Sequence, residues 1–276
     1  MLAAVLALGA SLSWGVGDFL GGLKSRVLHP LAIMAVSQPI GLALLGVAVA
    51  ARATGPPGPE VAWALLSAVF GTTALAAFYR GMAVGAISIV APIAGAGAAI
   101  PVVVGLATGD RPSALQGVGF VAAIGGVILS SWERSPGRSR WASGAGFGIV
   151  AMVGFGFYFV FLHMASTDDF LWPAFLFRVT SVSLVWAALL LVRPATGGIA
   201  GAWLVLIAIG CLDTGGNTLF AAASSHGSVS VTSVLASLYP VVTVFFARYH
   251  LHERVHRLQE AGIALTIAGI VLVSAG

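Results

Sequence analysis

Three ionisable side chains lie inside long apolar segments of the sequence: Asp18, Arg178 and Asp213. A charged group near the centre of a lipid bilayer costs about 2.5–3.5 kcal/mol on insertion scales, so such residues usually have a function and face the interior of a helix bundle. Asn217 follows Asp213 by one helical turn, which places both side chains on one face of a helix. The spacing predicts that this face lines a cavity.

Two interpretations of these charges stay open. In the first, at least one of Asp18 and Asp213 binds a substrate or a proton. In the second, Arg178 pairs with one acid as a buried structural ion pair. An acid held beside a cation stays ionised and carries protons poorly, so only the unpaired acid could take up a proton. We predict that Asp213→Asn abolishes activity and leaves the folded yield largely intact. Loss of folded protein in detergent would show instead that Asp213 is a structural partner of Arg178.

Aromatic rings with a polar edge form a second group of candidates, namely Trp14, Tyr158 and Tyr239. Tyr158 lies in the segment Gly154–Phe161, in which glycines and large rings alternate. The alternation indicates either close helix packing, for which small residues are typical, or a wall of rings on which a ligand stacks. Both interpretations stay open.

Prolines interrupt two of the apolar segments. Pro92 and Pro101 lie in the segment 86–107, and Pro240 lies in the segment 228–249. Because proline removes a helix hydrogen bond, we expect both segments to be kinked. The freed carbonyl groups could bind a polar substrate group or be satisfied by neighbouring side chains.

The composition predicts that membrane-spanning helices carry these residues. Of the 276 residues, 59% are apolar and 8% are charged, and the mean hydropathy is +1.02. A soluble domain has about 25% charged residues, so a soluble globular protein is excluded. A bilayer core of about 30 Å needs about 20 residues per helix, and the chain therefore has room for about ten spans. We expect helices near residues 2–22, 31–51, 61–80, 86–107, 114–131, 144–164, 171–192, 201–222, 228–249 and 258–275.

Several classes of partner are excluded by the same composition. The formal net charge is +4, but the basic residues are scattered and form no nucleic-acid surface. The single cysteine, Cys211, excludes an intrachain disulfide and a cysteine-based zinc site. Four histidines, His163, His250, His252 and His256, have no cluster of acids or thiols beside them. We expect no metal, no cofactor and no catalytic residues, because nucleotide-binding and hydrolase motifs are also missing from the sequence.

The sequence contains an internal repeat. Residues 110–131 match residues 253–274 at a constant offset, with identical pairs Arg111/Arg254, Leu115/Leu258, Gln116/Gln259 and Gly119/Gly262. The chain is therefore expected to consist of two homologous halves, residues 1–131 and 144–276, joined by a connecting loop at 132–143. Each half has five helices, an odd number, so the second half must enter the membrane in the opposite orientation. The predicted fold is an all-α integral membrane protein with ten transmembrane helices in two inverted five-helix repeats.

These features resemble the drug/metabolite transporter superfamily, and specifically its EamA-type members with ten helices. The resemblance is carried by Trp14-Gly-Val-Gly-Asp18-Phe, by Tyr79-Arg-Gly-Met-Ala-Val-Gly-Ala-Ile-Ser-Ile-Val-Ala-Pro92, by Asp213-Thr-Gly-Gly-Asn217 and by Leu235-Ala-Ser-Leu-Tyr239-Pro-Val-Val-Thr. It covers essentially the whole chain and is specific for the superfamily, but it says little about the substrate.

The resemblance implies a multi-pass carrier of the cell membrane that exports a small organic metabolite, such as an amino acid or an amine, by alternating access. Its partners would be the substrate, the lipid bilayer and protons as a coupling ion, with the chain either a monomer or a homodimer. The alternative is a membrane-embedded enzyme that acts on a lipid-like substrate. We expect a substrate or proton pocket near the bilayer midplane formed by Trp14, Asp18, Tyr79, Pro92, Tyr158, Arg178, Asp213, Asn217 and Tyr239.

The orientation in the membrane is ambiguous from the sequence. Loops on one side contain ten basic residues: Lys24, Arg26, Arg80, Arg134, Arg138, Arg140, Arg193, Arg248, Arg254 and Arg257. Loops on the other side contain two, Arg52 and Arg111. The positive-inside rule places the first set in the cytoplasm and both termini outside. The resemblance implies the opposite, with both termini in the cytoplasm.

Overall fold

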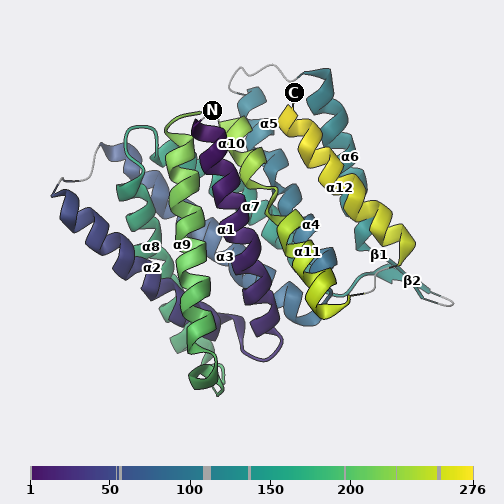
Figure 1. Cartoon of the computed structure of the whole chain (residues 1–276), viewed down its shortest axis with the longest axis horizontal. Helices are drawn as coiled ribbons and strands as arrows, with labels where there is room; N and C mark the ends of the chain where they lie inside the picture. The colour runs from purple at the N-terminus through teal and green to yellow at the C-terminus, as the bar shows by residue number, and fades with distance from the viewer. Residues whose placement is uncertain are drawn as a thin grey trace.

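The computed structural model describes residues 2–53, 55, 58–107, 113–135, 138–195, 197–227, 229–253 and 256–275. It is a bundle of helices with a single hairpin in these ranges (Figure 1). The α-helices are α1 (Leu2–Ser25), α2 (Pro30–Arg52), α3 (Trp63–Val84), α4 (Ile87–Gly95), α5 (Ala99–Ala107), α6 (Ala114–Ser131), α7 (Ala145–Ala165), α8 (Leu171–Val192), α9 (Trp203–Ser224), α10 (Val229–Ala236), α11 (Tyr239–Leu251) and α12 (Arg257–Ala275). Short 3₁₀ helices are η1 (Pro59–Ala62), η2 (Ala96–Ala98) and η3 (Ile199–Gly201).

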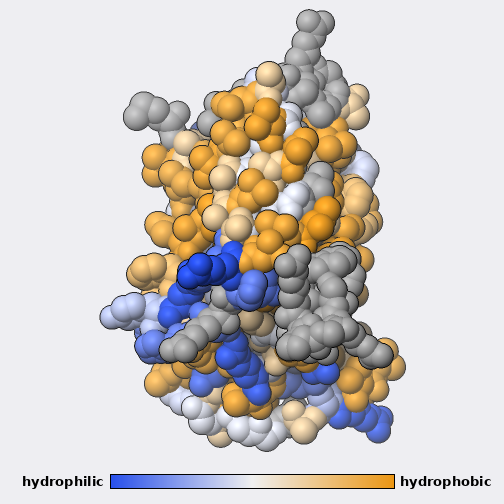
Figure 2. Space-filling view, turned by 90° about the vertical axis from the view of Figure 1, so that its right-hand side faces the viewer, coloured by the Kyte–Doolittle hydropathy of each residue, from blue (hydrophilic) through white to orange (hydrophobic). Residues whose placement is uncertain are grey.

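Seven helical segments are long and apolar enough to cross a membrane, counted over the described ranges. They are Leu2–Ser25, Pro30–Arg52, Ile87–Gly105, Ala145–Ala165, Leu171–Val192, Trp203–Ser224 and Thr232–Leu251. Large apolar side chains are exposed on the outside of the bundle, as at Leu191 (84%) and Val121 (74%). Figure 2 shows such residues over the upper part of the face, with hydrophilic residues gathered lower down. An apolar exterior of this extent needs lipid around it.

The segment expected to be a connecting loop, 132–143, contains an antiparallel hairpin. Strand β1 (Trp132–Ser135) pairs with β2 (Arg138–Trp141), and the register places Trp132 opposite Trp141. In Figure 1 the hairpin projects at the right, beside the end of α12 that lies away from the C-terminus, whereas both termini lie at the upper end of the bundle. We call these the hairpin end and the terminal end.

Two helices are broken, as the prolines predicted. One consists of α4, η2 and α5, and the other of α10 and α11 separated by the turn at residues 237–238. Pro101 and Pro240 each lie in the first turn after a break, where their missing N–H leaves a carbonyl of the preceding segment without its helical donor. The two breaks touch each other, because a Cβ atom added at Gly95, the last residue of α4, would collide with the ring of Pro240.

The helix packing has an approximate two-fold pattern. Helix α1 packs on α9, and α3 packs on α7. In each pair, one helix comes from the first half of the chain and the other from the second half. Between the halves, α2 packs on α8 and α6 packs on α12. The broken helices cross in opposite directions, because α4 contacts α11 whereas α5 contacts α10. This arrangement supports the inverted repeat inferred from the sequence.

Polar contacts tie the halves together at the hairpin end. Glu253, which follows α11, accepts hydrogen bonds from the backbone N–H groups of Ile87 (3.2 Å) and Ser88 (2.9 Å) at the start of α4, and it also pairs with Arg26. A carboxylate at this position stabilises the N-terminus of a helix. Nearby, burial lowers the pKa of His29, and Arg80 lowers it further. The neutral imidazole accepts a hydrogen bond from Leu31 N (3.2 Å) and caps α2.

At the terminal end an ion pair also joins the two halves. Arg52, at the end of α2, donates from one nitrogen to both carboxylate oxygens of Asp169 at 2.8 Å. Asp169 also accepts from Leu171 N (2.7 Å) at the start of α8. The loop between α7 and α8 is thereby fixed to the first half of the chain.

Candidate functional site

A narrow cavity lies inside the bundle, between the two halves of the chain. It has a volume of about 40 Å³ and is lined by Trp14, Asp18, Gln38, Gly71, Thr72, Leu75, Phe155, Tyr158, Phe159, Phe177, Ser181, Asp213, Asn217 and Tyr239. Seven helices contribute, namely α1, α2, α3, α7, α8, α9 and α11. Six of the nine residues predicted for the pocket line this cavity: Trp14, Asp18, Tyr158, Asp213, Asn217 and Tyr239.

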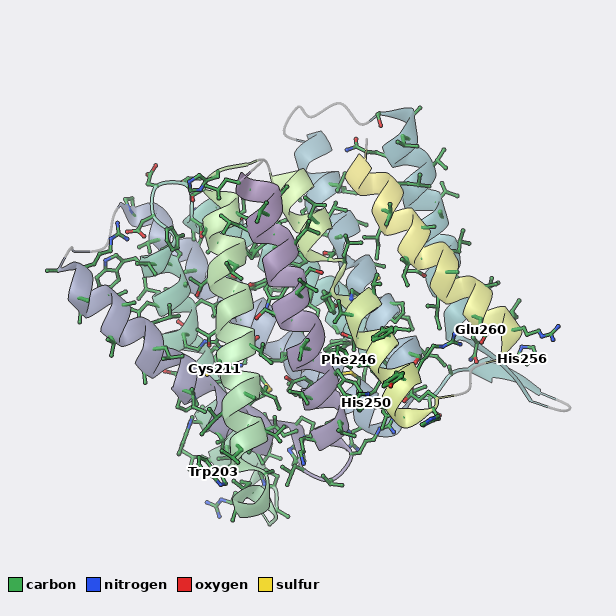
Figure 3. All side chains as sticks on the ribbon, in the orientation of Figure 1. Trp203, Cys211, Phe246, His250, His256 and Glu260 are labelled. Carbon is green, nitrogen blue, oxygen red and sulfur yellow. The ribbon has the colours of Figure 1, made fainter. Side chains whose placement is uncertain are left out.

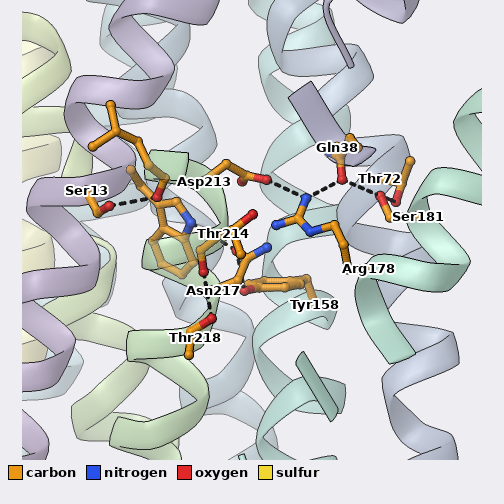
Figure 4. A network of polar contacts seen from close by, with 12 residues as sticks. Ser13, Gln38, Thr72, Tyr158, Arg178, Ser181, Asp213, Thr214, Asn217 and Thr218 are labelled. Atoms are coloured by element: carbon orange, nitrogen blue, oxygen red, sulfur yellow. Dashed lines mark hydrogen bonds and ion pairs between the residues drawn. The ribbon is translucent and has the colours of Figure 1, made fainter. Parts of the chain in front are cut away.

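A chain of polar contacts crosses one wall of the cavity (Figure 4). Arg178 Nη1 donates to Asp213 Oδ2 at 2.7 Å and also to Gln38 Oε1. Ser181 Oγ donates to the same Gln38 oxygen (3.0 Å), and Thr72 Oγ1 donates to Ser181 Oγ (2.7 Å). The chain joins α2, α3, α8 and α9 and includes a fully buried Arg178. We call these five residues the Arg178 cluster.

The Arg178 cluster answers the question of which acid Arg178 pairs with. The ion pair is made with Asp213, whose side chain is 18% exposed. Asp18 lines the same cavity and is 8% exposed, but it makes no hydrogen bond or ion pair with any residue in the described ranges. The geometry therefore supports a structural part for Asp213 and leaves Asp18 as the unpaired acid.

Asn217 connects two of the predicted rings. Its Oδ1 accepts from Trp14 Nε1 (3.0 Å) and from Tyr158 Oη (3.0 Å). The ring of Trp14 lies directly over Gly216, where an added Cβ would be 2.5 Å from the indole, so glycine beside Asn217 is required for this approach. The side chains of Asp213 and Asn217 both reach the cavity, as the one-turn spacing predicted.

In the alternating segment of α7 the glycines pack against neighbouring helices, and three of the rings line the cavity. An added Cβ at Gly154 would lie 2.7 Å from Ala74 Cβ, and at Gly156 it would lie 2.8 Å from Gly97 O, so the glycines are required for close packing on α3 and η2. The rings of Phe155, Tyr158 and Phe159 line the cavity. Tyr158 meets Trp14 edge-on with centroids 6.0 Å apart.

Three predicted pocket residues do not line the cavity. Arg178 lies behind its wall, in contact with Asp213. Tyr79 is buried against Gly21, one turn beyond Asp18 on α1. Pro92 is buried within α4. Of the two broken helices, the one in the second half reaches the cavity, through Tyr239 at the start of α11.

Eight lining residues were missed by sequence reasoning: Gln38, Gly71, Thr72, Leu75, Phe155, Phe159, Phe177 and Ser181. Four of them had a usable signal, since Phe155 and Phe159 lie in the alternating segment Gly154–Phe161. Gln38 is an amide inside an apolar span, and Ser181 lies one turn after Arg178 on the same helix face. The others are small, apolar or aromatic residues that occur throughout the spans.

Trp203, Cys211 and His250, which are labelled in Figure 3, do not line the cavity. Trp203 begins α9 and is 54% exposed, as expected of a residue at the membrane interface. His250 meets the ring of Phe19 with centroids 5.8 Å apart. Cys211 is exposed on α9.

Three comparisons with known proteins complete the description. Residues 1–132 and 142–275 each match the EamA-like transporter family. No curated protein matches the sequence. Among solved structures, 25 chains match. One of them, described only as "Crystal structure of protein", has a TM-score of 0.73 and 17% sequence identity. The match covers 99% of this chain and 96% of that chain. This likeness concerns the fold.

Proposed function

Because the chain belongs to the EamA-like transporter family, we propose that it is a secondary transporter that exports a small organic metabolite, such as an amino acid or an amine, by alternating access around the cavity. In this proposal ten transmembrane helices form two inverted repeats, residues 1–131 and 144–276, in the cell membrane. The chain acts as a monomer or a homodimer and catalyses no reaction.

The observation that carries the proposal is the position of the cavity. Polar groups from both halves, Asp18 and Gln38 from one and Asp213 and Asn217 from the other, converge inside a bundle whose exterior is apolar. A site between inverted repeats is typical of secondary transporters. At about 40 Å³ the cavity has room for about three water molecules, so a metabolite enters only when the halves move apart.

The alternative, a membrane-embedded enzyme, would need acidic or histidine groups free to react. The sequence has one pair of adjacent acids, Asp168 and Asp169. Asp169 is occupied by Arg52 and by the backbone of Leu171, which favours a structural part. No observation on the described residues favours a reaction over transport.

We propose the orientation that the positive-inside rule gives. Lys24, Arg26, Arg193, Arg248 and Arg257 lie at or near helix ends on the hairpin side of the bundle. The hairpin end would then be cytoplasmic and both termini external. A cysteine introduced next to Met1 in a Cys211→Ala background tests this, because an impermeant thiol reagent added to intact cells labels it only if the termini are outside.

The transport proposal is tested with purified protein in liposomes loaded with amino acids, amines, sugars and nucleosides. Mass spectrometry follows which species leave, with and without a pH gradient, and protein-free liposomes give the background. Selective, protein-dependent release of one class supports the proposal. If liposomes that contain folded protein release nothing, the transport proposal is overturned for these metabolite classes.

A further inference from the structure

Two amide side chains of the cavity are held in one orientation by their partners. The first is Gln38 of α2, whose Oε1 accepts hydrogen bonds from Arg178 Nη1 and from Ser181 Oγ (3.0 Å). A guanidinium group can only donate, so the oxygen of the Gln38 amide, and not its nitrogen, must face Arg178. The hydrogens of Gln38 Nε2 therefore point away from this contact, and they have no acceptor among the described residues.

The second amide is Asn217 of α9. Its Oδ1 accepts from Trp14 Nε1 and from Tyr158 Oη, both at 3.0 Å. The indole N–H also can only donate, so the orientation of this amide is fixed in the same way. Asn217 Nδ2 has no acceptor in the part of the chain that the structure describes. Both Gln38 and Asn217 line the cavity, so one amide N–H2 group from each half is left for a ligand.

A hydrogen-bond acceptor lies beside the Gln38 donor. Arg178 Nη1 binds Asp213 Oδ2 (2.7 Å) on one side and Gln38 Oε1 on the other, so the two head groups are neighbours across one nitrogen atom (Figure 4). Asp213 stays in the Arg178 cluster through Oδ2 alone, and its Oδ1 has no partner among the described residues. Arg178 itself is 0% exposed. The part of this wall that faces a ligand is therefore a donor, Gln38 Nε2, next to an acceptor, Asp213 Oδ1.

A carboxamide or lactam group has the complementary pattern. Its C=O accepts and its N–H donates along one planar edge, so it can bind the amide of Gln38 and the carboxylate of Asp213 together. A carboxylate has no hydrogen for Asp213 Oδ1, and an alkylammonium group has no acceptor for Gln38 Nε2. Buried polar groups that a ligand leaves unpaired lower its affinity strongly, so a site of this kind rejects ligands that lack the matching group.

The rest of the lining suits a flat polar group on an apolar body. Asn217 lies one turn after Asp213 on the same helix face, so its Nδ2 is placed to donate to the second lone pair of a carbonyl oxygen. Aromatic rings pack well on planar groups. Six of them line the cavity: Trp14, Phe155, Tyr158, Phe159, Phe177 and Tyr239.

We propose that the transported metabolite carries a carboxamide or lactam group, and that Gln38, Asp213 and Asn217 select for it. The carbonyl oxygen accepts from Gln38 Nε2 and Asn217 Nδ2, and the N–H donates to Asp213 Oδ1. This inference rests on the proposed transport function and specifies its substrate class.

The selection is coupled to closure of the cavity. Gln38 belongs to the first half of the chain, whereas Asp213 and Asn217 belong to the second. A substrate that bonds to all three bridges the halves, so its binding favours the closed arrangement. A ligand without the group leaves a buried donor or acceptor unpaired when the cavity closes.

The first experiment measures, by isothermal titration calorimetry in detergent, the binding of phenylalaninamide, phenylalanine and phenethylamine to the purified protein. The probes share a ring and an amine and differ in one group, which is a carboxamide, a carboxylate or hydrogen. We expect the amide to bind about 10-fold more tightly than phenethylamine, which has the same charge, and than phenylalanine. Phenylalanine N,N-dimethylamide lacks the amide N–H and should lose this preference. Equal binding of the amide and phenethylamine overturns the inference.

Two variants of nearly unchanged shape remove one donor each. Gln38→Glu and Asn217→Asp keep the oxygen that accepts in the wild type and replace the N–H2 group with a second oxygen. We expect each to lower the ratio of amide to phenethylamine affinity about 10-fold. Gln259→Glu is the matched control, because its Oε1 likewise accepts, from His256 N (3.2 Å), and it lies on α12 outside the cavity lining. A preference that survives either variant overturns the inference; if a variant does not fold, the dimethylamide comparison in the wild type decides.

The second experiment follows the same probes out of liposomes. Protein-dependent release of phenylalaninamide in preference to phenethylamine, with the preference lost in Asn217→Asp, supports the inference. Release of phenylalanine or phenethylamine without a preference for the amide overturns it and leaves the transport function standing. If none of the probes and none of the metabolite pool moves, the proposed function itself fails.

Discussion

The two acids of the cavity have opposite surroundings. Asp213 is the more exposed of the two side chains, yet it belongs to the Arg178 cluster, which joins four helices. Asp18 is more deeply buried and has no polar partner in the described residues. The comparison teaches that burial alone does not identify the functional acid. A carboxylate whose hydrogen bonds are satisfied by the protein stabilises the fold, whereas one left unsatisfied is available to a ligand.

The largest expected effect comes from removing the cation of the Arg178 cluster. Arg178→Gln leaves Asp213 without its counter-ion and Gln38 Oε1 with Ser181 as its one remaining donor in the described structure, and breaking a buried pair costs about 3–5 kcal/mol of folding free energy. We expect little folded protein after size-exclusion chromatography. Arg193→Gln, at an exposed position, is the control. Wild-type yield and melting temperature in Arg178→Gln would contradict the assignment.

A smaller loss is expected for Asp213→Asn. The amide oxygen still accepts a hydrogen bond from Arg178, but the charge is lost, so we expect about 2 kcal/mol of destabilisation. The double variant Arg178→Gln with Asp213→Asn removes both charges and should recover at least about 1 kcal/mol relative to the sum of the single variants. The test is a double-mutant cycle of thermal unfolding in detergent. Strict additivity would mean that the two residues are not coupled.

The hydrogen bonds that Asn217 accepts from Trp14 and Tyr158 connect α1 and α7 to α9. Removing one of them is expected to destabilise the fold less than the loss of the Asp213 charge. Tyr158→Phe removes one of the two donors to Asn217 Oδ1 and keeps the ring, so about 1 kcal/mol should be lost. Tyr249→Phe, whose side chain is 69% exposed, should change nothing. Equal melting temperatures for both variants would show that this hydrogen bond contributes no stability.

The smallest effect on stability is expected at Asp18. Asp18→Asn breaks no contact in the described structure, so the free energy of unfolding should stay within about 0.5 kcal/mol of the wild type or rise. Transport should nevertheless be lost. A calorimetric scan and a liposome assay on one protein preparation test both statements. A strongly destabilised Asp18→Asn would place this acid in the same structural class as Asp213.

Much of the fold could be predicted from the sequence because the constraints are strong. Span length and hydropathy predicted the helices, of which seven in the described ranges are long and apolar enough to cross a membrane, and the prolines predicted the breaks around Gly95 and Pro240. Two halves, as the repeat predicted, each match the family. The hairpin in the connector was not predicted, because its residues show no clear strand signal.

The site was only partly predictable. Charges and polar rings in the middle of spans predicted six lining residues, because a polar group in lipid is costly and therefore usually faces the interior of the bundle. The pairing of Arg178 with Asp213, and its separation from Asp18, depends on how α8 meets α9 and α2. The spacing of residues along the chain does not predict how these three helices pack. Leu75 and Phe177 were missed for a related reason, since apolar residues carry no signal inside apolar helices.

The contact between Gly95 and Pro240 joins the two broken helices at a shared pivot. Each break belongs to a different half, and the ring of Pro240 packs directly on Gly95, which has no Cβ atom to keep it away. We therefore expect a bend in one broken helix to displace the other. In the proposed alternating access, coupling at this contact would make the opening of one side of the cavity accompany the closing of the other.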